Sequence, residues 1–125
     1  MTRSSRLSLR LFSITLLLAL LAASGCHSYH IDATIENHTG APIKLLEVDY
    51  PSASFGLDRL DNGGTFHYRF QVRGSGPLTV QYAASDGHQA QITGPTLHEN
   101  QQGPIEIILL PGAKAQFLPS FTSHS

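Results

Sequence analysis

Several residue types are scarce or absent in this chain of 125 residues. It has no Trp and a single Cys, Cys26, so no disulfide can form within one molecule. Charged residues make up only 14% of the chain, and no stretch gathers basic residues into a stripe. That absence argues against nucleic-acid binding. The chain also lacks internal repeats and low-complexity tracts, so its organisation has to be deduced from hydrophobic patterns.

The longest uncharged apolar run is at the N-terminus. Arg3, Arg6 and Arg10 precede residues 11–23, and small residues follow at positions 22–25. A basic start, a short apolar middle and a small-residue end are typical of a secretory signal peptide. A membrane-spanning helix needs about 17–25 apolar residues, more than this run provides. We therefore expect residues 1–25 to be a signal peptide that is removed on export.

The residue after this run is the only Cys in the chain. The sequence Ala23-Ser24-Gly25-Cys26 resembles the lipobox of bacterial lipoproteins, although Ala23 stands where Leu is usual. The resemblance implies that Cys26 carries a diacylglyceryl group and that the signal peptide is cleaved between Gly25 and Cys26. Two or more acyl chains, at about 0.8 kcal/mol per buried CH₂, make a stable membrane anchor. The alternative is an ordinary secretory peptide followed by an incidental Cys.

The residue after the Cys bears on localisation. By resemblance to the sorting rule of enterobacteria, His27 in place of Asp favours the outer membrane over the inner membrane. The mature 100 residues would carry five basic and nine acidic side chains, a net charge of about −4 with His neutral. Anionic headgroups would not attract such a surface, so the acyl chains would have to hold it. We expect an exported protein, anchored to the bacterial cell envelope.

Alternating apolar and polar residues predict short β-strands along the mature chain. Residues 29–36 alternate, and residues 43–50 form a second strand whose pattern slips at Leu45-Leu46, which indicates a bulge. Residues 52–57 are a weaker candidate. The clearest strand is 66–72, in which every second side chain is apolar. Its inward-facing residues are expected to be Phe66, Tyr68, Phe70 and Val72.

The turn at Ser85-Asp86-Gly87 predicts a hairpin with a defined register. A three-residue loop pairs Tyr82 with Ala90 and Val80 with Ile92, which keeps one face of the hairpin apolar. A two-residue loop would mix polar and apolar residues on both faces. We therefore expect Gly87 in the left-handed region, forming a bulge that follows a type I turn.

The same reasoning applied to the preceding turn pairs Phe70 with Val80 and Val72 with Leu78. It predicts that residues 65–94 form a three-stranded antiparallel meander.

About seven short strands at regular spacing predict an all-β fold, a single antiparallel β-sandwich over residues 29–112, with residues 26–28 as tether. Segments 35–43, 66–70 and 76–82 resemble small immunoglobulin-like or fibronectin-type-III-like modules of bacterial surface proteins. The resemblance covers most of residues 29–110 and implies a fold rather than an activity.

The last part of the chain gives weaker signals. Residues 105–110 are almost wholly apolar, which indicates a strand covered on both sides or an outer face that contacts a partner. Residues 113–125 contain Phe117, Leu118 and Phe121 among small and polar residues. We expect a flexible tail that leaves the domain at the end opposite Cys26. It either reaches a partner or a groove on the same domain, or is a disordered end without a role.

Seven His residues raise the possibility of a copper or zinc site. Those weighed are His27, His30, His38, His67, His88 and His98. A metal site needs three or four converging ligands, and no HxH, HxxxH or Cys pair brings these together. Asp58, Asp61 and Asn62 suggest a calcium loop only faintly, because its terminal Glu is missing. No metal ligand and no cofactor is predicted, and solvated surface His is the simpler interpretation.

Enzyme signatures are similarly sparse. Glu47 and Asp49 lie two residues apart, hence on one strand face, where paired carboxylates can do acid–base chemistry or simply face solvent. No nucleophile elbow and no phosphate-binding loop is present. The leading hypothesis is a non-enzymatic, lipid-anchored β-sandwich lipoprotein acting as a binding or assembly module. The alternatives are a periplasmic His-based copper or zinc binder and, with less support, a small hydrolase.

Overall fold

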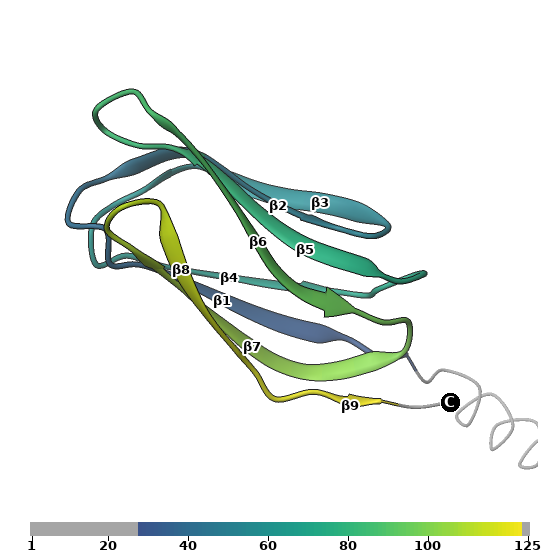
Figure 1. Ribbon diagram of the computed structural model, residues 1–125. Coiled ribbons are helices and arrows are strands. Elements are labelled where there is room, and N and C mark those ends of the chain that lie inside the picture. The colour runs from purple at the N-terminus through teal and green to yellow at the C-terminus, as the bar shows by residue number, and fades with distance from the viewer. Residues whose placement is uncertain (1–27, 124–125) are drawn as a thin grey trace, which may run out of the picture.

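The computed structural model describes residues 28–123, which form nine β-strands in two facing sheets (Figure 1). Within these residues no helix is long and apolar enough to cross a membrane. The strands are β1 (Ile31–Asn37), β2 (Ile43–Tyr50), β3 (Ala53–Leu60), β4 (Thr65–Phe70), β5 (Gly76–Ala83), β6 (Gln89–Leu97), β7 (Gln101–Leu110), β8 (Lys114–Pro119) and β9 (Thr122–Ser123).

The predicted β-sandwich is confirmed. One sheet has the order β4-β1-β7-β8, with β9 added to β7, and the other has the order β3-β2-β5-β6. Alternate residues of both sheets point between them, and 18 buried apolar side chains from Ile31 to Leu109 form the core. Because that core lies entirely within the sandwich, the domain can fold without the residues before it.

The number of strands and the direction of one strand pairing differ from expectation. Nine strands replace the predicted seven, and β1 pairs with β7 in parallel, with Ile31 opposite Gly103 and Asn37 opposite Leu109. In an immunoglobulin constant domain the first strand pairs with the second. Here β1 and β2 belong to different sheets. The sandwich architecture is therefore shared with immunoglobulin domains, whereas the strand order is not.

The hairpin of β5 and β6 has the predicted register. Val80 lies opposite Ile92 and Tyr82 opposite Ala90. The loop closes with a hydrogen bond from the Gly87 amide to the Ala84 carbonyl at 3.0 Å, and Gly87 has a φ of 89°. That positive φ favours glycine, as expected for a bulge after a type I turn.

The predicted meander over residues 65–94 is wrong, because β4 does not pair with β5. β4 pairs with β1, placing Phe70 opposite Ile31, while β5 pairs with β2 and β6. Residues 71–75 cross from one sheet to the other. Val72 is buried in that crossing, so the alternation gave its burial correctly but not its partner strand.

The bulge predicted in β2 is confirmed. The register between β2 and β5 shifts between Lys44 and Glu47, and Leu45 adopts a φ of 53° with its side chain exposed. The bulge brings the Leu46 carbonyl so close to Gly56 on β3 that a Cβ at Gly56 would overlap the oxygen. Gly56 thus gives the bulged strand room to pair.

An aromatic cluster closes the side of the sandwich where edge strands β3 and β4 meet. The Tyr68 ring stacks on the Phe55 ring at 4.2 Å and 15°, and Phe70 lies 4.3 Å from Tyr50 between ring centroids. Phe70 is buried and Phe66 is half-buried, but Tyr68 is 40% exposed. The expectation that Tyr68 is buried is wrong, because β4 is an edge strand and no further strand covers its outermost side.

The predicted flexible tail is also wrong for the described residues. β8 pairs antiparallel with β7, with Phe117 opposite Ile107, and β9 pairs with the start of β7. The Phe117 ring packs on the backbone of Gly94 where β6 and β8 lie side by side, while Leu118 remains exposed on the outer face. The ordered domain therefore continues to residue 123 instead of ending at 112.

β7 shows why residues 105–110 are so apolar. Ile105, Ile107 and Leu109 point into the core, whereas Ile108 and Leu110 on the outer face are half-buried. The strand has neighbours on both edges, β1 and β8, but its outer face is not fully covered.

A prediction follows from the contact between Phe117 and Gly94. A Cβ at Gly94 would lie 2.7 Å from Cε1 of Phe117, closer than atoms can pack. We expect Gly94→Ala to lower the free energy of unfolding by about 1–3 kcal/mol, the usual cost of overpacking. Urea unfolding should show that the double variant Gly94→Ala with Phe117→Leu loses less than the sum of the two single changes. Strict additivity would contradict the contact.

The strand directions define two ends of the domain. We call the end where β1 begins the N-terminal pole and the end where β1 stops, at Asn37, the distal pole. β7 runs parallel to β1, so Pro111 lies at the distal pole, as expected for the end of residues 29–112. β8 and β9 then return, and Ser123 lies opposite Gln101 at the N-terminal pole (Figure 1). The described tail does not reach outward from the distal pole.

Candidate functional site

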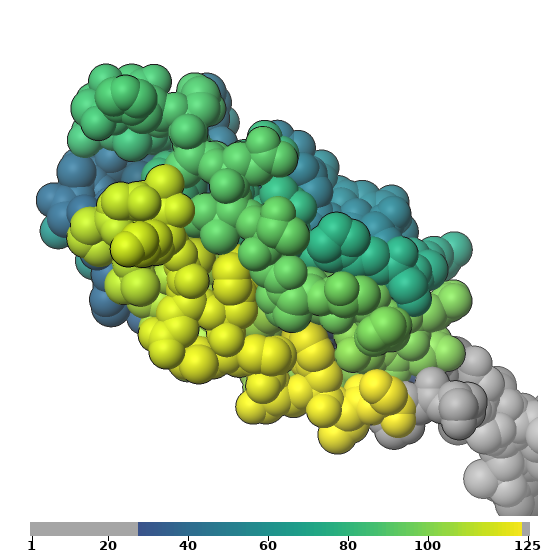
Figure 2. Space-filling model, in the orientation of Figure 1, coloured from purple at the N-terminus to yellow at the C-terminus, as the bar shows by residue number. Residues whose placement is uncertain are grey.

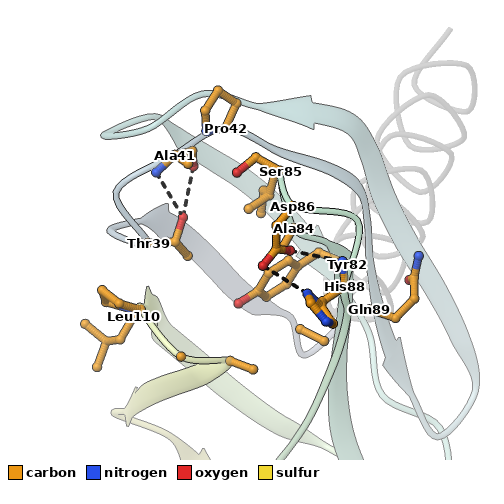
Figure 3. Close-up of a pocket in the computed structure, with 15 residues that line it drawn as sticks. Thr39, Ala41, Pro42, Tyr82, Ala84, Ser85, Asp86, His88, Gln89 and Leu110 are labelled. Carbon is orange, nitrogen blue, oxygen red and sulfur yellow. Dashed lines mark hydrogen bonds and ion pairs between the residues drawn. The ribbon is translucent and has the colours of Figure 1, made fainter.

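The distal pole contains a hollow of about 530 Å³ between three loops. The β1–β2 loop (38–42), the β5–β6 turn (84–88) and the β7–β8 turn (111–113) surround it (Figure 3). In Figure 2 these loops, coloured blue, green and yellow, lie together at one end of the molecule. The volume is within the range of about 300–1,000 Å³ found for small-molecule sites.

The hollow exists because small side chains line it. Ala41, Ala84, Ala90 and Ala113 contribute to its wall together with Gly112, where most of the core is filled by Ile, Leu, Val and aromatic residues. Unfilled space at the end of a core costs stability, since the lining atoms lack packing partners. A ligand with an apolar body would supply those contacts.

Asn37 fixes the shape of the first loop. It is the one buried polar side chain among the described residues, with 0% exposure. Its Nδ2 donates to the carbonyls of Ala41 at 2.9 Å and Leu60 at 3.0 Å, and its Oδ1 accepts from the Thr39 amide at 3.0 Å. The Gly63 amide donates to the Asn37 carbonyl at 2.7 Å. Asn37 thus links the two segments that cross from one sheet to the other, residues 38–42 before β2 and residues 61–64 before β4.

Asp86 and His88, in the β5–β6 turn, form part of the rim of the hollow. One carboxylate oxygen of Asp86 accepts the His88 amide at 3.0 Å, and the other lies 2.9 Å from Nδ1 of the His88 ring. These hydrogen bonds, first from the His88 backbone and then from its side chain, lower the pKa of Asp86. Asp86 therefore stays ionised, while the His88 side chain is 86% exposed.

Tyr82 brings a polar atom to the floor of the hollow. The residue as a whole is only 3% exposed, and its hydroxyl makes no hydrogen bond to the protein within residues 28–123. Because no buried side-chain polar atom of these residues lacks a partner, the hydroxyl is not sealed off but is open to water in the hollow. Figure 3 shows that hydroxyl pointing into the space between the loops. Burial raises the pKa of Tyr82, so the group remains a neutral O–H that can donate and accept.

No family model matches this chain, and no curated protein or solved structure is significantly similar to it. The functional argument therefore depends on the residues and geometry of this molecule.

The His residues proposed as metal ligands are dispersed over the domain. His38 pairs with Glu36 at 3.1 Å, His67 with the Thr34 hydroxyl at 3.0 Å, and His98 lies 3.3 Å from the Ser75 hydroxyl. Within the described part of the chain no three His, Cys, Asp or Glu side chains are grouped to hold a metal ion. His27 lies outside the described residues.

The segment that faintly suggested a calcium loop is held by local hydrogen bonds. Asp61 accepts from Nε of Arg59 at 2.7 Å, and Oδ1 of Asn62 accepts from the Gly40 amide at 3.1 Å. Both oxygens are directed to neighbouring protein groups and do not point to a common centre, which agrees with the interpretation as a turn.

Glu47 and Asp49 lie on the same outer face of β2, as expected. Their hydrogen bond and charge repulsion raise the pKa of Glu47, and Nε2 of Gln81 donates to Asp49 at 2.9 Å. The nearest hollow, of about 370 Å³, is a shallow depression over Gly56 and the bulge. Ser54 lies opposite Asp49 on β3, but within the described residues its hydroxyl makes no hydrogen bond to either carboxylate, so the geometry fits a solvent-facing pair.

Cys26 and Gly25, the predicted lipidation and cleavage residues, lie outside the described residues. The hollow at the distal pole was not predicted from the sequence. The apolar hairpin face that contains Tyr82 and Ala90 was predicted, and small residues such as Ala90 on that face close to a strand end were the available signal.

Proposed function

We propose that this chain is a lipid-anchored, non-enzymatic binding module of the bacterial cell envelope. Acyl chains on Cys26 hold it at a membrane, and the hollow at the distal pole receives a ligand or partner. The observation that carries the proposal is the location of the hollow at the end of β1 opposite its start, with a tyrosine hydroxyl open to it that makes no hydrogen bond to the described protein. His27 favours the periplasmic face of the outer membrane.

Chain lengths support this orientation. Residues 27–30 can separate Cys26 from the start of β1 by no more than about 15–18 Å, at roughly 3.3–3.6 Å per residue. β1, with seven residues, then extends about 20 Å toward the distal pole. The N-terminal pole is therefore near the headgroups, whereas the three loops face away from them.

The local chemistry supports binding rather than catalysis. Ser85, Asp86 and His88 all line the hollow, but among residues 28–123 the Ser85 hydroxyl makes no hydrogen bond with His88. A serine nucleophile needs such a bond to its base. The Asp86–His88 pair instead closes a turn, and Glu47 with Asp49 lies on an open face.

Site-specific photo-crosslinking in the native envelope tests the proposal. A photoreactive residue replaces Ser85 at the rim, or Ser54 on the outer face of β3 as the matched control. We expect one discrete adduct from position 85 that weakens when Tyr82→Phe is added, and no such adduct from position 54. Equal adducts from both positions, or none from position 85, would contradict binding at the distal pole.

A further inference from the structure

Given the proposed binding function, we infer that the hollow takes an uncharged ligand with a ring-sized apolar body and one hydrogen-bonding oxygen or nitrogen. The apolar body fills the space left by the small side chains, and the polar atom pairs with the Tyr82 hydroxyl. Three features of the hollow support this inference: its lining, its free hydroxyl and its charge.

The lining sets the size and polarity of the ligand body. The alanines and Gly112 leave about 530 Å³ open, and the floor consists of Ile43, Ala90 and the ring of Tyr82. Ile43 and Ala90 are themselves buried, so the floor is continuous with the core. A planar or compact apolar group that covers this floor removes both its own surface and that of the floor from water.

The Tyr82 hydroxyl defines the polar contact. The ring of Tyr82 is buried, but its hydroxyl points into the hollow and makes no hydrogen bond to the described protein. The hydroxyl is therefore open to water, which a ligand atom that forms the same hydrogen bond can displace. A carbonyl, amide or alcohol on the ligand would satisfy it, since the neutral phenol can donate and accept.

Charge excludes carboxylates as the preferred group. Asp86 is the only acidic residue in the lining and stays ionised through its hydrogen bonds with His88. A ligand carboxylate would meet this charge at close range. A ligand cation gains little in return, because both Asp86 oxygens already accept hydrogen bonds from His88. An uncharged polar group is therefore favoured.

The loops are held in place without a ligand. Asn37 clamps the first loop, Asp86 closes the second with His88, and Gly112 with Ala113 forms a tight turn at φ values of 80° and 56°. Because these loops are pre-organised, binding does not have to order them.

The test uses naphthaleneacetamide as the uncharged probe and naphthaleneacetate as the matched anion. The protein is the mature chain with Cys26→Ser, whose sandwich contains a complete core. We follow amide shifts by NMR during titration with each probe. We expect saturable shifts at the backbone amides of residues 82–90 and 112–113 with naphthaleneacetamide, and binding of naphthaleneacetate at least about fivefold weaker.

Variants make the assignment specific. Tyr82→Phe keeps the ring but removes the hydroxyl. It should weaken the binding of naphthaleneacetamide by about 3- to 10-fold and change the affinity for naphthaleneacetate less. Ala84→Leu fills the hollow at its rim and should abolish saturable binding, whereas Ala53→Leu, exposed near the other pole, should not. Equal affinity of the two probes, or of wild type and Tyr82→Phe, would overturn the inference.

Failure of this inference and failure of the proposed function can be told apart. If neither probe binds while Ser85 still crosslinks in a Tyr82-dependent way, the ligand class is wrong and the binding module stands. If the amide binds as expected but no crosslink forms at Ser85, the site exists and the proposed role in the envelope is wrong.

Discussion

Phe70→Ala is expected to lower the free energy of unfolding by about 3–5 kcal/mol, the usual cost of truncating a core aromatic. Phe70 is 4% exposed and lies opposite Ile31 in its own sheet. The centroid of its ring lies 4.3 Å from that of Tyr50 and 5.5 Å from that of Phe55, and both of these residues are on the other sheet. The ring therefore joins the two sheets at their β3–β4 side, and its loss leaves a cavity that neither edge strand can fill.

Two neighbours on β4 provide graded controls. Tyr68→Ala should cost clearly less than Phe70→Ala, because Tyr68 is 40% exposed although it stacks on Phe55. His67→Ala should change stability little, since its hydrogen bond to Thr34 is on the exposed face. Urea unfolding of the three variants measures the order. Equal losses at positions 67 and 70 would show that the register of β4 is wrong.

Asn37→Ala is expected to have the second largest effect, a loss of about 2–4 kcal/mol. Leaving a buried carbonyl without a partner costs about 1–3 kcal/mol, and Asn37 serves two carbonyls, those of Leu60 and Ala41. Asn37→Asp should also destabilise at neutral pH, because a carboxylate keeps the acceptor for Thr39 but cannot donate to either carbonyl.

The matched control is Asn62→Ala. Asn62 also hydrogen bonds the first loop, through the Gly40 amide, but this bond is exposed to solvent. Its removal should cost only a few tenths of a kcal/mol to about 1 kcal/mol. Thermal or urea unfolding in which the variants at positions 37 and 62 lose the same stability would contradict the role of Asn37 as the buried clamp of the distal pole.

Sequence patterns predicted the parts of the fold that local rules control. The β5–β6 hairpin was obtained correctly because loop length, the glycine and the buried face all select one register. The bulge at Leu45 was visible as a break in alternation. The step from β4 to β5 looked equally local, but residues 71–75 can serve as a hairpin loop or as a crossing between sheets. Only the long-range pairing of β1 with β4 decides between them.

The wrong predictions for Tyr68 and for the segment after Pro111 also arise from long-range strand pairing that the local sequence does not show. Alternation correctly put Tyr68 on the inward face but could not show that β4 ends its sheet. The segment after Pro111 has too few apolar residues to build a core alone, which favoured a loose tail. It is ordered because β7 offers a free edge and Gly94 leaves room for Phe117. Neither condition is visible in residues 113–125 themselves.

The candidate site was less predictable than the fold. The lipobox resemblance depends on adjacent residues and can be recognised directly. The hollow depends on three loops that are far apart in the sequence, at residues 38–42, 84–88 and 111–113. It also depends on a Tyr82 hydroxyl without a protein partner, which only the packed structure reveals. The burial of Asn37 follows from the later crossing at residues 61–64, whose backbone pairs with that of Asn37.

The most direct test of the account is the mass of the mature N-terminus, combined with membrane partitioning. We predict that the native protein begins at Cys26, carries acyl chains on that residue and partitions with membranes. The Cys26→Ala variant should be a folded protein that stays in the aqueous fraction. A native protein that starts elsewhere without lipid, or a Cys26→Ala protein that still partitions with membranes, would contradict the anchored binding module.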